Sequence, residues 1–505
     1  MIVGNPFATA EVGSRAPADR RCRLGFTVDV DRFAAALVDA DGTVLASVED
    51  VAPSASSSVV LPRALAGIMA QAGPRGVALD HVDQVMMAIN EVDGRAGIRE
   101  VDPDWSCWPG QLSPIGVVRL GAATTALPPL AGWPERLRSD VSVRAACVAG
   151  GAGVDGADFE PLDTAGLAAF ARTVAGKVDA VVVSGVFAPV MPSDELAAAG
   201  LLRAELGDSV PILLSHEAGG AGLLPRENAT VLQAVLLGKA TGALRRLRRS
   251  MAQNGLAHAE LFLARGDGSI MTADYGLTRS VQLHGAAKAV GAQGAAMLAG
   301  ESNALVLFTT PDGEPTAVCA VAAGQARLAS GPTDIAGVPT SVRSVAVVPT
   351  VPPVGGFPRT AADRIAEAVD RVKDVSGDLP LLVVGPGAGK LVDALPGAPA
   401  GTTLVCCPPR ANAAVAVGAA TALVTGSATR VLAADSRHGG DIRGKVVDQA
   451  LAAAVHAGAD PDRVEVIMVD EAMVARGAGP DLLLRVSAGG PPRTAWQYGR
   501  RRSPH

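Results

Sequence analysis

Aromatic side chains are scarce in this chain of 505 residues, which holds 9 Phe, 4 Trp and 2 Tyr, or 3% in all. Hydrophobic residues nevertheless make up 49% of the chain, and charged residues only 19%. The core must therefore consist mainly of Ala, Val and Leu. A chain of this length is too long for one compact core, so we expect two or three domains.

A basic excess is also missing. Lys and Arg total 44 against 50 Asp and Glu, which gives a formal net charge of −6, whereas nucleic-acid binding needs a positive field. Nucleic acid is thereby excluded as the main partner. The run Arg245–Arg249 favours a solvated helix end.

Long apolar segments are lacking too. No run approaches the roughly 18–20 residues of a membrane span, and residues 1–22 have no apolar stretch of the kind found in secretory signals. We expect a cytoplasmic protein without a membrane partner. Its first 22 residues are expected to form a flexible extension.

Cysteine is rare, and its spacing excludes the usual metal motifs. None of the six cysteines forms a CxxC pair, which structural zinc sites require. Cys406 and Cys407 are adjacent on a predicted strand, so their side chains should point to opposite faces and no disulfide is expected between them. Free thiols fit a reducing compartment.

Short runs of Val, Leu and Ile alternate with Ala-rich helical runs, a pattern typical of α/β proteins. The expected strands are 24–28, 35–39, 82–89, 179–184, 211–214, 260–263, 304–308, 317–322, 381–384, 404–407, 464–469 and 482–486. The expected helices are 58–72, 163–174, 193–205, 230–251, 285–298, 361–373 and 411–423. The spacing over 179–214 predicts a parallel crossover. The segment 91–130 has no clear assignment.

The most specific text in the chain runs Leu214-Ser215-His216-Glu217-Ala218-Gly219-Gly220-Ala221-Gly222-Leu223-Leu224-Pro225-Arg226-Glu227-Asn228-Ala229-Thr230-Val231-Leu232-Gln233. It resembles the signature of the hydantoinase A/oxoprolinase family, which usually reads close to LSHE-x-G-x-x-GLLERENAT-x-LNA. Pro225 replaces an acidic residue there, and Gln233 replaces Asn.

Five further segments, including residues 458–486 with the outline of the family's C-terminal module, extend this likeness over roughly residues 24–487. Residues 178–189 are similar to the family text VDA-V-V-SG-x-FSP, and 264–268 to QS-x-GG. Residues 284–292 resemble SGPA-x-GV-x-GA, and 407–419 resemble VPP-x-AG-x-x-SA-x-GA.

The resemblance implies an α/β fold with two ribonuclease-H-like (actin-like ATPase) halves around a central cleft, plus a small C-terminal α/β module. On that basis we expect a flexible extension at 1–22 and an N-terminal hydantoinase/oxoprolinase-like domain at 23–230. A second actin-like domain should span 231–425, and a C-terminal module with a flexible tail should span 426–505.

The phosphate loops of the family are the part that this chain lacks. Each half usually carries D-x-GGT-x-TD, in which glycines bring backbone N–H groups to the phosphates and Asp holds Mg²⁺. The segment 27–34 has no Gly-Gly pair, and in 306–315 Phe308 takes the carboxylate's place. ATP and Mg²⁺ are implied by the resemblance, while both phosphate loops are lost.

Two groups of residues are candidates for cofactor and metal binding. Gly385, Gly387, Gly389 and Lys390 follow a predicted strand and open a helix, a position suited to adenosine or phosphate. The alternative is a plain strand-to-helix turn, since the spacing is not that of a Walker A loop. Asp29 and Asp31, at i and i+2, would hold a cation on one strand face or simply form a solvated strand end.

His216, Glu217, Glu227 and His284 are the candidates for acid–base chemistry. Ser215, His216 and Glu217 lie at a strand's carboxyl end, where α/β sheets place ligands. Contiguous side chains diverge, however, so these three cannot form a triad.

Two interpretations of this segment stay open. His216 and Glu227 form an acid–base or metal pair, or else they join Arg226 in a polar network that fixes the helix start. His284 stands where the family has Ser, either as a general base or ligand or as a drifted position without a role.

By resemblance, the chain is an ATP-dependent cyclic-amide hydrolase subunit that acts on hydantoin, 5-oxoproline or a lactam with a companion B-type subunit. The eroded loops favour a second hypothesis, in which a degenerate or repurposed relative serves as a binding or scaffold subunit without ATP turnover. We expect a small-molecule substrate and a homo-oligomer.

Overall fold

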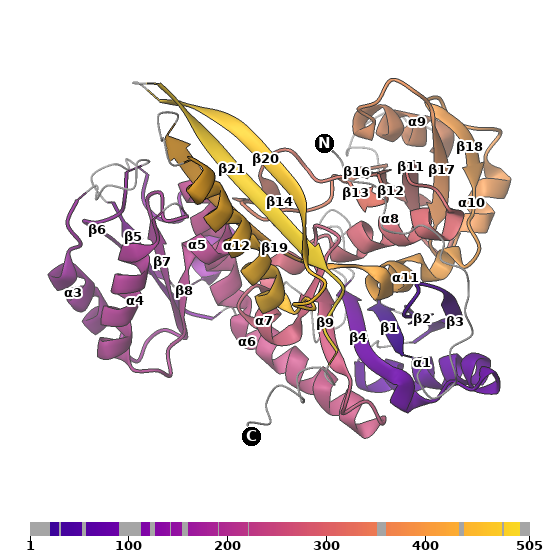
Figure 1. Cartoon of the computed structure of the whole chain (residues 1–505), viewed down its shortest axis with the longest axis horizontal. Helices are drawn as coiled ribbons and strands as arrows, with labels where there is room; N and C mark the ends of the chain where they lie inside the picture. Colours follow the sequence, from indigo (N-terminus) through magenta and orange to yellow (C-terminus); the bar gives the residue numbers. More distant parts are fainter. Residues whose placement is uncertain are drawn as a thin grey trace.

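The computed structural model describes residues 21–29, 32–52, 57–89, 113–121, 127–141, 143–153, 160–189, 191–220, 222–350, 360–433, 439–476 and 479–494. In these residues the chain forms sheets of nine, six, four and two strands with helices packed between them. The four-stranded sheet lies at one end of the long axis, and the six-stranded sheet lies toward the other (Figure 1). The α/β expectation is confirmed.

The nine-stranded sheet has the order β20-β21-β19-β10-β9-β4-β1-β2-β3. Its bounds are β1 Cys22–Val28, β2 Arg32–Asp39, β3 Val44–Val51, β4 Val82–Ile89, β9 Glu260–Ala264, β10 Ile270–Thr272, β19 Val424–Ala433, β20 Glu465–Arg476 and β21 Gly479–Gly490. β1 is antiparallel to β2 and parallel to β4. The turn that joins β2 to β3 contains Asp41 and Gly42, with Gly42 at φ 87°.

The six-stranded sheet has the order β13-β12-β11-β17-β18, with β16 also paired to β12. Its bounds are β11 Ala304–Thr309, β12 Pro315–Ala322, β13 Gln325–Ala326, β16 Val348–Pro349, β17 Leu379–Val384 and β18 Thr402–Cys406. The helices α8 Ala286–Ala299, α9 Ala361–Val372 and α10 Ala388–Ala394 belong to this part of the chain. β14 Thr333–Ile335 and β15 Val338–Thr340 form the two-stranded sheet.

The four-stranded sheet is parallel throughout, in the order β6-β5-β7-β8. Its elements are β5 Ile115–Leu120, α2 Glu135–Asp140, β6 Val143–Val148, α3 Thr164–Val174, β7 Ala180–Gly185, α4 Ser193–Leu206 and β8 Ile212–Leu214. The crossover predicted over 179–214 is confirmed.

The remaining helices either join strands of one sheet or lead from one sheet to the next. They are α1 Ser57–Ala72, α5 Ser215–Ala218, α6 Leu223–Gln253, α7 Ala273–Leu277, α11 Ala414–Thr421 and α12 Gly439–Ala457, with 3₁₀ turns at Gly73–Arg75, Leu79–His81, Ser280–Leu283 and Ala411–Ala413. α6 begins seven residues before the predicted start at 230, so Arg226, Glu227 and Asn228 lie within its first turns.

Backbone-to-backbone contact of α11 with α8 and β1 fixes the centre of the molecule. A Cβ on Gly418 would lie 1.7 Å from the Val290 carbonyl oxygen, and one on Gly294 would lie 2.0 Å from that of Ala414. On the other side of α11, a Cβ on Gly25 would meet the carbonyl oxygen of Ala416 at 1.8 Å. Only glycine fits at such distances.

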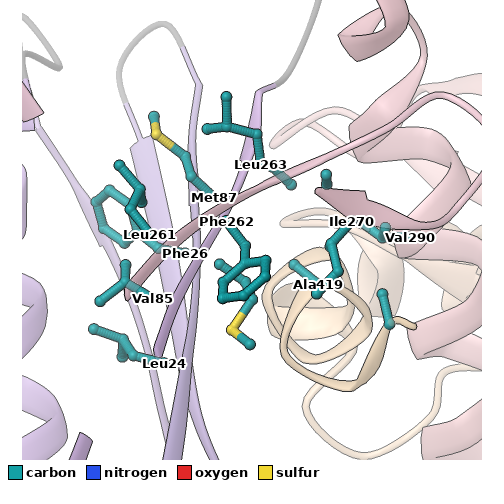
Figure 2. Packing of buried hydrophobic residues seen from close by; sticks show 14 of the residues in the cluster. Leu24, Phe26, Val85, Met87, Leu261, Phe262, Leu263, Ile270, Val290 and Ala419 are labelled. Carbon is teal, nitrogen blue, oxygen red and sulfur yellow. The ribbon is translucent and has the colours of Figure 1, made fainter. Parts of the chain in front are cut away.

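Small aliphatic residues dominate the largest core cluster, as the composition predicts. Phe26 and Phe262 are fully buried among Val85, Ile270 and Ala419 (Figure 2). The side chains come from β1, β4, β9, β10 and α11, so this core joins the N-terminal strands to the middle of the chain.

The structure does not test the predicted domain limits, the predicted N-terminal extension or the segment 91–130. Strands from 22–89, 260–272 and 424–490 share one sheet, so that sheet crosses the predicted domain limits at 230 and 425. That division stays a prediction. The extension 1–22 and the segment 91–130 lie largely outside the described residues. No described helix combines the length and apolarity needed to cross a membrane.

Candidate functional site

A cavity of about 280 Å³ lies between the nine-stranded and six-stranded sheets. The volume is just below the usual range for small-molecule sites, roughly 300–1,000 Å³. Six segments supply its walls: the β1–β2 hairpin, β3, the start of α8, the β11–β12 turn, the β17–α10 turn and the start of α11. The polar lining residues are Thr27, Asp29, Arg32, Glu49, Lys288, Thr309, Thr310, Thr316 and Asn412. We call this cavity the cleft.

The β1–β2 turn closes one side of the cleft. The Asp29 N–H donates to the Arg32 carbonyl oxygen at 2.8 Å, which holds the end of β1 against the start of β2. Arg32 in turn pairs with Glu49 at 2.9 Å, so its charge is already balanced. Asp29 lines the cleft. Asp31, the second predicted metal ligand, lies outside the described residues.

The β11–β12 turn lines the cleft opposite the β1–β2 turn. Phe308 and Thr309 line the cavity at the end of β11. Thr309 donates its hydroxyl to the Val384 carbonyl oxygen at 3.2 Å. Thr310 Oγ1 accepts from the Glu314 N–H at 3.1 Å, which leaves its own O–H free to donate.

The glycine loop predicted to bind a cofactor only partly faces the cleft. Gly385 lines it at φ 107°. Gly387 packs against the neighbouring turn, where an added Cβ would lie 2.1 Å from the Thr310 carbonyl oxygen. Gly389 and Lys390 are not among the lining residues, and Lys390 Nζ donates to the Pro311 carbonyl oxygen at 3.0 Å.

The lining holds some of the side chains that a magnesium–nucleotide group needs, but fewer than usual. Mg²⁺ is usually held by one or two carboxylates together with phosphate oxygens, and Asp29 is such a carboxylate. Lys288 and the Thr310 hydroxyl are suited to phosphate oxygens. Within the described ranges, no group of three or more His, Cys, Asp or Glu side chains could hold a metal by protein ligands alone.

The family-like motif lies away from this lining, at the carboxyl edge of the four-stranded sheet. Glu227, on α6, accepts two hydrogen bonds from Arg119 of β5, at 2.8 Å from Nε and 2.6 Å from Nη2. Ser184 of β7 donates to the same carboxylate at 2.6 Å. Both charged side chains are fully buried. Burial alone would lower the pKa of Arg119, but Glu227 outweighs it and raises that pKa.

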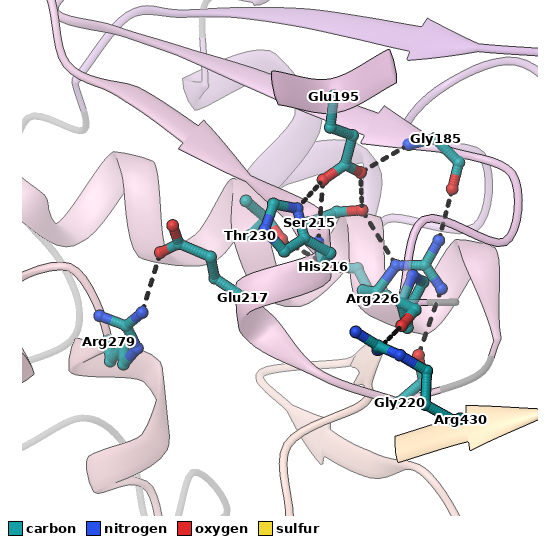
Figure 3. Close-up of polar contacts among 11 residues, drawn as sticks. Gly185, Glu195, Ser215, His216, Glu217, Gly220, Arg226, Thr230, Arg279 and Arg430 are labelled. Atoms are coloured by element: carbon teal, nitrogen blue, oxygen red, sulfur yellow. Dashed lines mark hydrogen bonds and ion pairs between the residues drawn. The ribbon is translucent and has the colours of Figure 1, made fainter. Parts of the chain in front are cut away.

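A second buried carboxylate organises the rest of the motif. Glu195 of α4 accepts from the Gly185 N–H at 2.7 Å, from Ser215 Oγ at 2.5 Å and from His216 (Figure 3). His216 Nδ1 lies 2.6 Å from Glu195 Oε2.

Arg226 completes the same arrangement from the first turn of α6. Its Nε donates to Ser215 Oγ at 2.9 Å, and its Nη2 donates to the Gly185 carbonyl oxygen at 2.6 Å. Burial lowers the pKa of Arg226 to about 10, which still leaves it charged at neutral pH. We call Arg119, Ser184, Glu195, Ser215, His216, Arg226 and Glu227 the motif network.

The motif network decides between the two sequence-based interpretations of this segment. The partner of His216 is Glu195, whereas Glu227 pairs with Arg119. The two candidate catalytic residues therefore do not form the predicted acid–base pair. Arg226 and Glu227 instead tie the start of α6 to the sheet.

The other two candidates lie elsewhere. Glu217 points away from His216 and pairs with Arg279 at 2.9 Å (Figure 3), and Arg279 also stacks on Tyr275. His284 is half-buried just before α8, and its carbonyl oxygen accepts from Ser344 Oγ at 3.2 Å. The four predicted catalytic residues are thus not brought together.

Sequence reasoning missed Arg119, Glu195 as a hydrogen-bond acceptor, and Lys288. Arg119 is embedded in the apolar run of β5, where a lone charge is a usable signal that a buried partner exists. Lys288 lies in the segment 284–292, which was noted for its resemblance only.

Comparison with known proteins shows which solved structures share this fold. No protein-family profile matches the chain, and no curated protein sequence matches it. Acetone carboxylase, solved in a nucleotide-free state in work on ATP-dependent acetone carboxylation, matches with a TM-score of 0.60 at 13% identity over 95% of this chain and 83% of its own.

The ATP-dependent caprolactamase from Pseudomonas jessenii matches with a TM-score of 0.63 at 14% identity over 92% and 87%. Both belong to the hydantoinase/oxoprolinase family. The predicted resemblance is confirmed at the level of the fold.

Proposed function

We infer that the chain is a divergent member of the hydantoinase A/oxoprolinase family that binds ATP in its cleft to activate an amide-type substrate. The cleft carries the proposal, because one cavity gathers the β1–β2, β11–β12 and β17–α10 turns with Lys288. The fold shared with two ATP-dependent enzymes supports it.

The strand order supports two related halves on either side of the cleft. In one sheet the antiparallel pair β2–β1 continues into parallel β4, and in the other the pair β12–β11 continues into parallel β17. In this proposal β19 to β21 and α12 belong largely to the C-terminal module.

Each lining residue would have a limited role. Lys288 would neutralise phosphate charge, Asp29 would hold Mg²⁺, and Thr310 would donate its hydroxyl to a phosphate oxygen. Bound ATP would supply a phosphoryl group that turns an amide oxygen into a better leaving group. The substrate class is a cyclic amide such as hydantoin, 5-oxoproline or a lactam, and ring opening would use a companion B-type subunit.

Calorimetry with ATP and Mg²⁺ tests the nucleotide site. We expect a dissociation constant on the order of 100 μM or tighter. Lys288→Ala should weaken binding about tenfold, because it removes one charge-assisted contact. Lys177→Ala, at an exposed position in the turn after α3, is the matched control. Absence of saturable binding in the wild type would overturn the proposal.

The repurposed relative remains the second candidate, and one observation favours it. Phe308 lines the cleft at the end of β11, where the family would place a metal-binding carboxylate. ATP hydrolysis measured with hydantoin, 5-oxoproline and caprolactam, with and without a B-type subunit, separates the two. Nucleotide binding without hydrolysis under all these conditions would favour the scaffold.

A further inference from the structure

Three arginines from distant parts of the chain lie near β19 and β21, outside the lining of the cleft, and the charge of Arg343 interacts with those of Arg265 and Arg485. Arg265 belongs to the β9–β10 turn, Arg343 to the segment after β15, and Arg485 to β21. The Val345 N–H donates to the Gly266 carbonyl oxygen at 2.7 Å, which holds the segment of Arg343 against the turn of Arg265. Together with Asp267, Asp470 and Ser487, we call them the arginine cluster.

Arg265 is anchored but incompletely bonded. Its Nη1 donates to the Thr425 carbonyl oxygen at 3.2 Å, and its Nη2 lies 3.3 Å from Asp267 Oδ2. Its Nε is buried and has no hydrogen-bond partner among the described residues. Buried polar atoms nearly always have a partner, so this N–H indicates a missing acceptor.

Ser487 supplies an independent observation of the same kind. It lies two residues after Arg485 on β21, so both side chains project from one face of the sheet. Ser487 is 6% exposed, and its Oγ has no hydrogen-bond partner in the part of the chain that the structure describes. Among the described residues, the ion-pair partner of Arg485 is Asp470 across the strands, at a long distance of 3.9 Å.

The cluster has three positive charges, from its arginines, and two negative charges, from Asp267 and Asp470, so one positive charge is left without a carboxylate. Asp267 and Asp470 face Arg265 and Arg485, whereas Arg343 has no ion pair with a described residue. Partial withdrawal from water lowers the pKa of Arg343, Asp267 and Asp470 raise it, and Arg485 and Arg265 lower it further. An anion among the three guanidinium groups would relieve that repulsion.

We propose that Arg265, Arg343 and Arg485 form a binding site for a small oxyanion, a carboxylate or a phosphate group, distinct from the cleft. Guanidinium groups match both kinds of anion through paired N–H donors. The Ser487 hydroxyl and the Arg265 Nε–H would supply further donors. Arg265 and Asp267 replace Ser and Gly of the family text QS-x-GG, so these two charges set this chain apart.

Thermal unfolding with inorganic phosphate, and separately with acetate, tests the site at an ionic strength held constant with sodium chloride. We expect saturable stabilisation by at least one of the two, with a dissociation constant on the order of 1 mM or tighter. Arg343→Ala and Arg485→Ala should each weaken that binding about tenfold. A response to phosphate alone identifies a phosphorylated ligand, and a response to acetate alone identifies a carboxylate.

Two control variants keep this result separate from nucleotide binding. Arg172→Ala, on the exposed end of α3, should bind as the wild type does. Lys288→Ala should also keep the response, because Lys288 lines the cleft and none of the three arginines does. Stabilisation that survives both cluster substitutions, or that Lys288→Ala removes, would overturn the proposal. Failure of ATP to bind would leave it standing.

Discussion

The motif network and the arginine cluster both combine arginines with carboxylates, yet they differ in completeness. In the motif network Arg119, Arg226, Glu195 and Glu227 are fully buried, and each makes several short hydrogen bonds. In the arginine cluster the ion-pair contacts are 3.3 and 3.9 Å long, and two buried polar atoms have no partner among the described residues. A complete network holds a fold together, whereas an incomplete one leaves room for a ligand.

This contrast bears on the two interpretations of the motif that the sequence leaves open. The motif that best resembles the family supplies the complete network, so its visible role is to fix α6 and α4 against the parallel sheet. Arg265 and Asp267, the charged residues that depart from the family text, belong to the incomplete network, the arginine cluster. At this site, a motif similar to the family's therefore indicates a shared structural network more directly than it indicates a shared reaction.

The largest effect should come from breaking the Arg119–Glu227 pair. Arg119→Met leaves the Glu227 carboxylate buried with only the Ser184 hydroxyl as a described partner. We expect a loss of about 3–5 kcal/mol in the free energy of unfolding, the usual cost of an uncompensated buried charge. Urea denaturation measures it.

The double variant Arg119→Met with Glu227→Met is the control, since it removes both charges. It should recover part of the loss. A single variant as stable as the wild type would mean that the pair does not hold the fold together.

Asn228→Ala should have the next largest effect. Asn228 accepts from Trp133 Nε1 at 2.7 Å and donates to the Pro339 carbonyl oxygen at 3.0 Å, next to the motif network. Removing the amide leaves two buried groups unpaired, at about 1–3 kcal/mol. Urea denaturation checks this, and Asn303→Ala at an exposed turn serves as the control. Equal stability of the two variants would contradict the prediction.

Arg343→Ala should change stability by no more than about 0.5 kcal/mol in either direction. The reason is that Arg343 interacts with two carboxylates and two like charges in the arginine cluster, and these attractions and repulsions offset one another. Thermal unfolding without added phosphate or acetate measures the change. Destabilisation comparable to that of Arg119→Met would erase the distinction between the two regions.

The smallest effect should appear only in acid. Burial raises the pKa of Asp267, but Arg265, hydrogen bonds from Ser269, and Arg343 outweigh it and lower that pKa. The stability it contributes is therefore present above the ordinary carboxyl pKa and is lost as pH falls through the lowered value. Asp267→Asn should lose less stability than the wild type between about pH 5 and pH 2. Unfolding curves over that range check it, and parallel losses would refute it.

The regular elements could be predicted from sequence because their signals are local. Alternating apolar runs located β7, β8, α3 and α4 within one or two residues at most ends. The start of α6 lies seven residues before the predicted one, and the helix includes Pro225 because proline is well tolerated in a first helical turn.

The partners within the site could not be predicted in the same way. Arg119 and Glu227 are 108 residues apart, and no periodic pattern links a strand residue to a helix residue at that distance. The divergence of His216 and Glu217 was predictable from their contiguity. Their partners, Glu195 and Arg279, depend on how α4 and the segment after α7 pack, which only the fold decides.

The buried pair of Arg119 and Glu227 also constrains how the sequence can change during evolution. Losing either partner alone is costly, whereas losing both together costs far less. Among relatives with this parallel sheet, we expect the two positions to be substituted jointly or not at all. A search that finds relatives by the Arg-Glu-Asn text would then select chains that retain this buried ion pair. It would do so whether or not their clefts still bind a nucleotide.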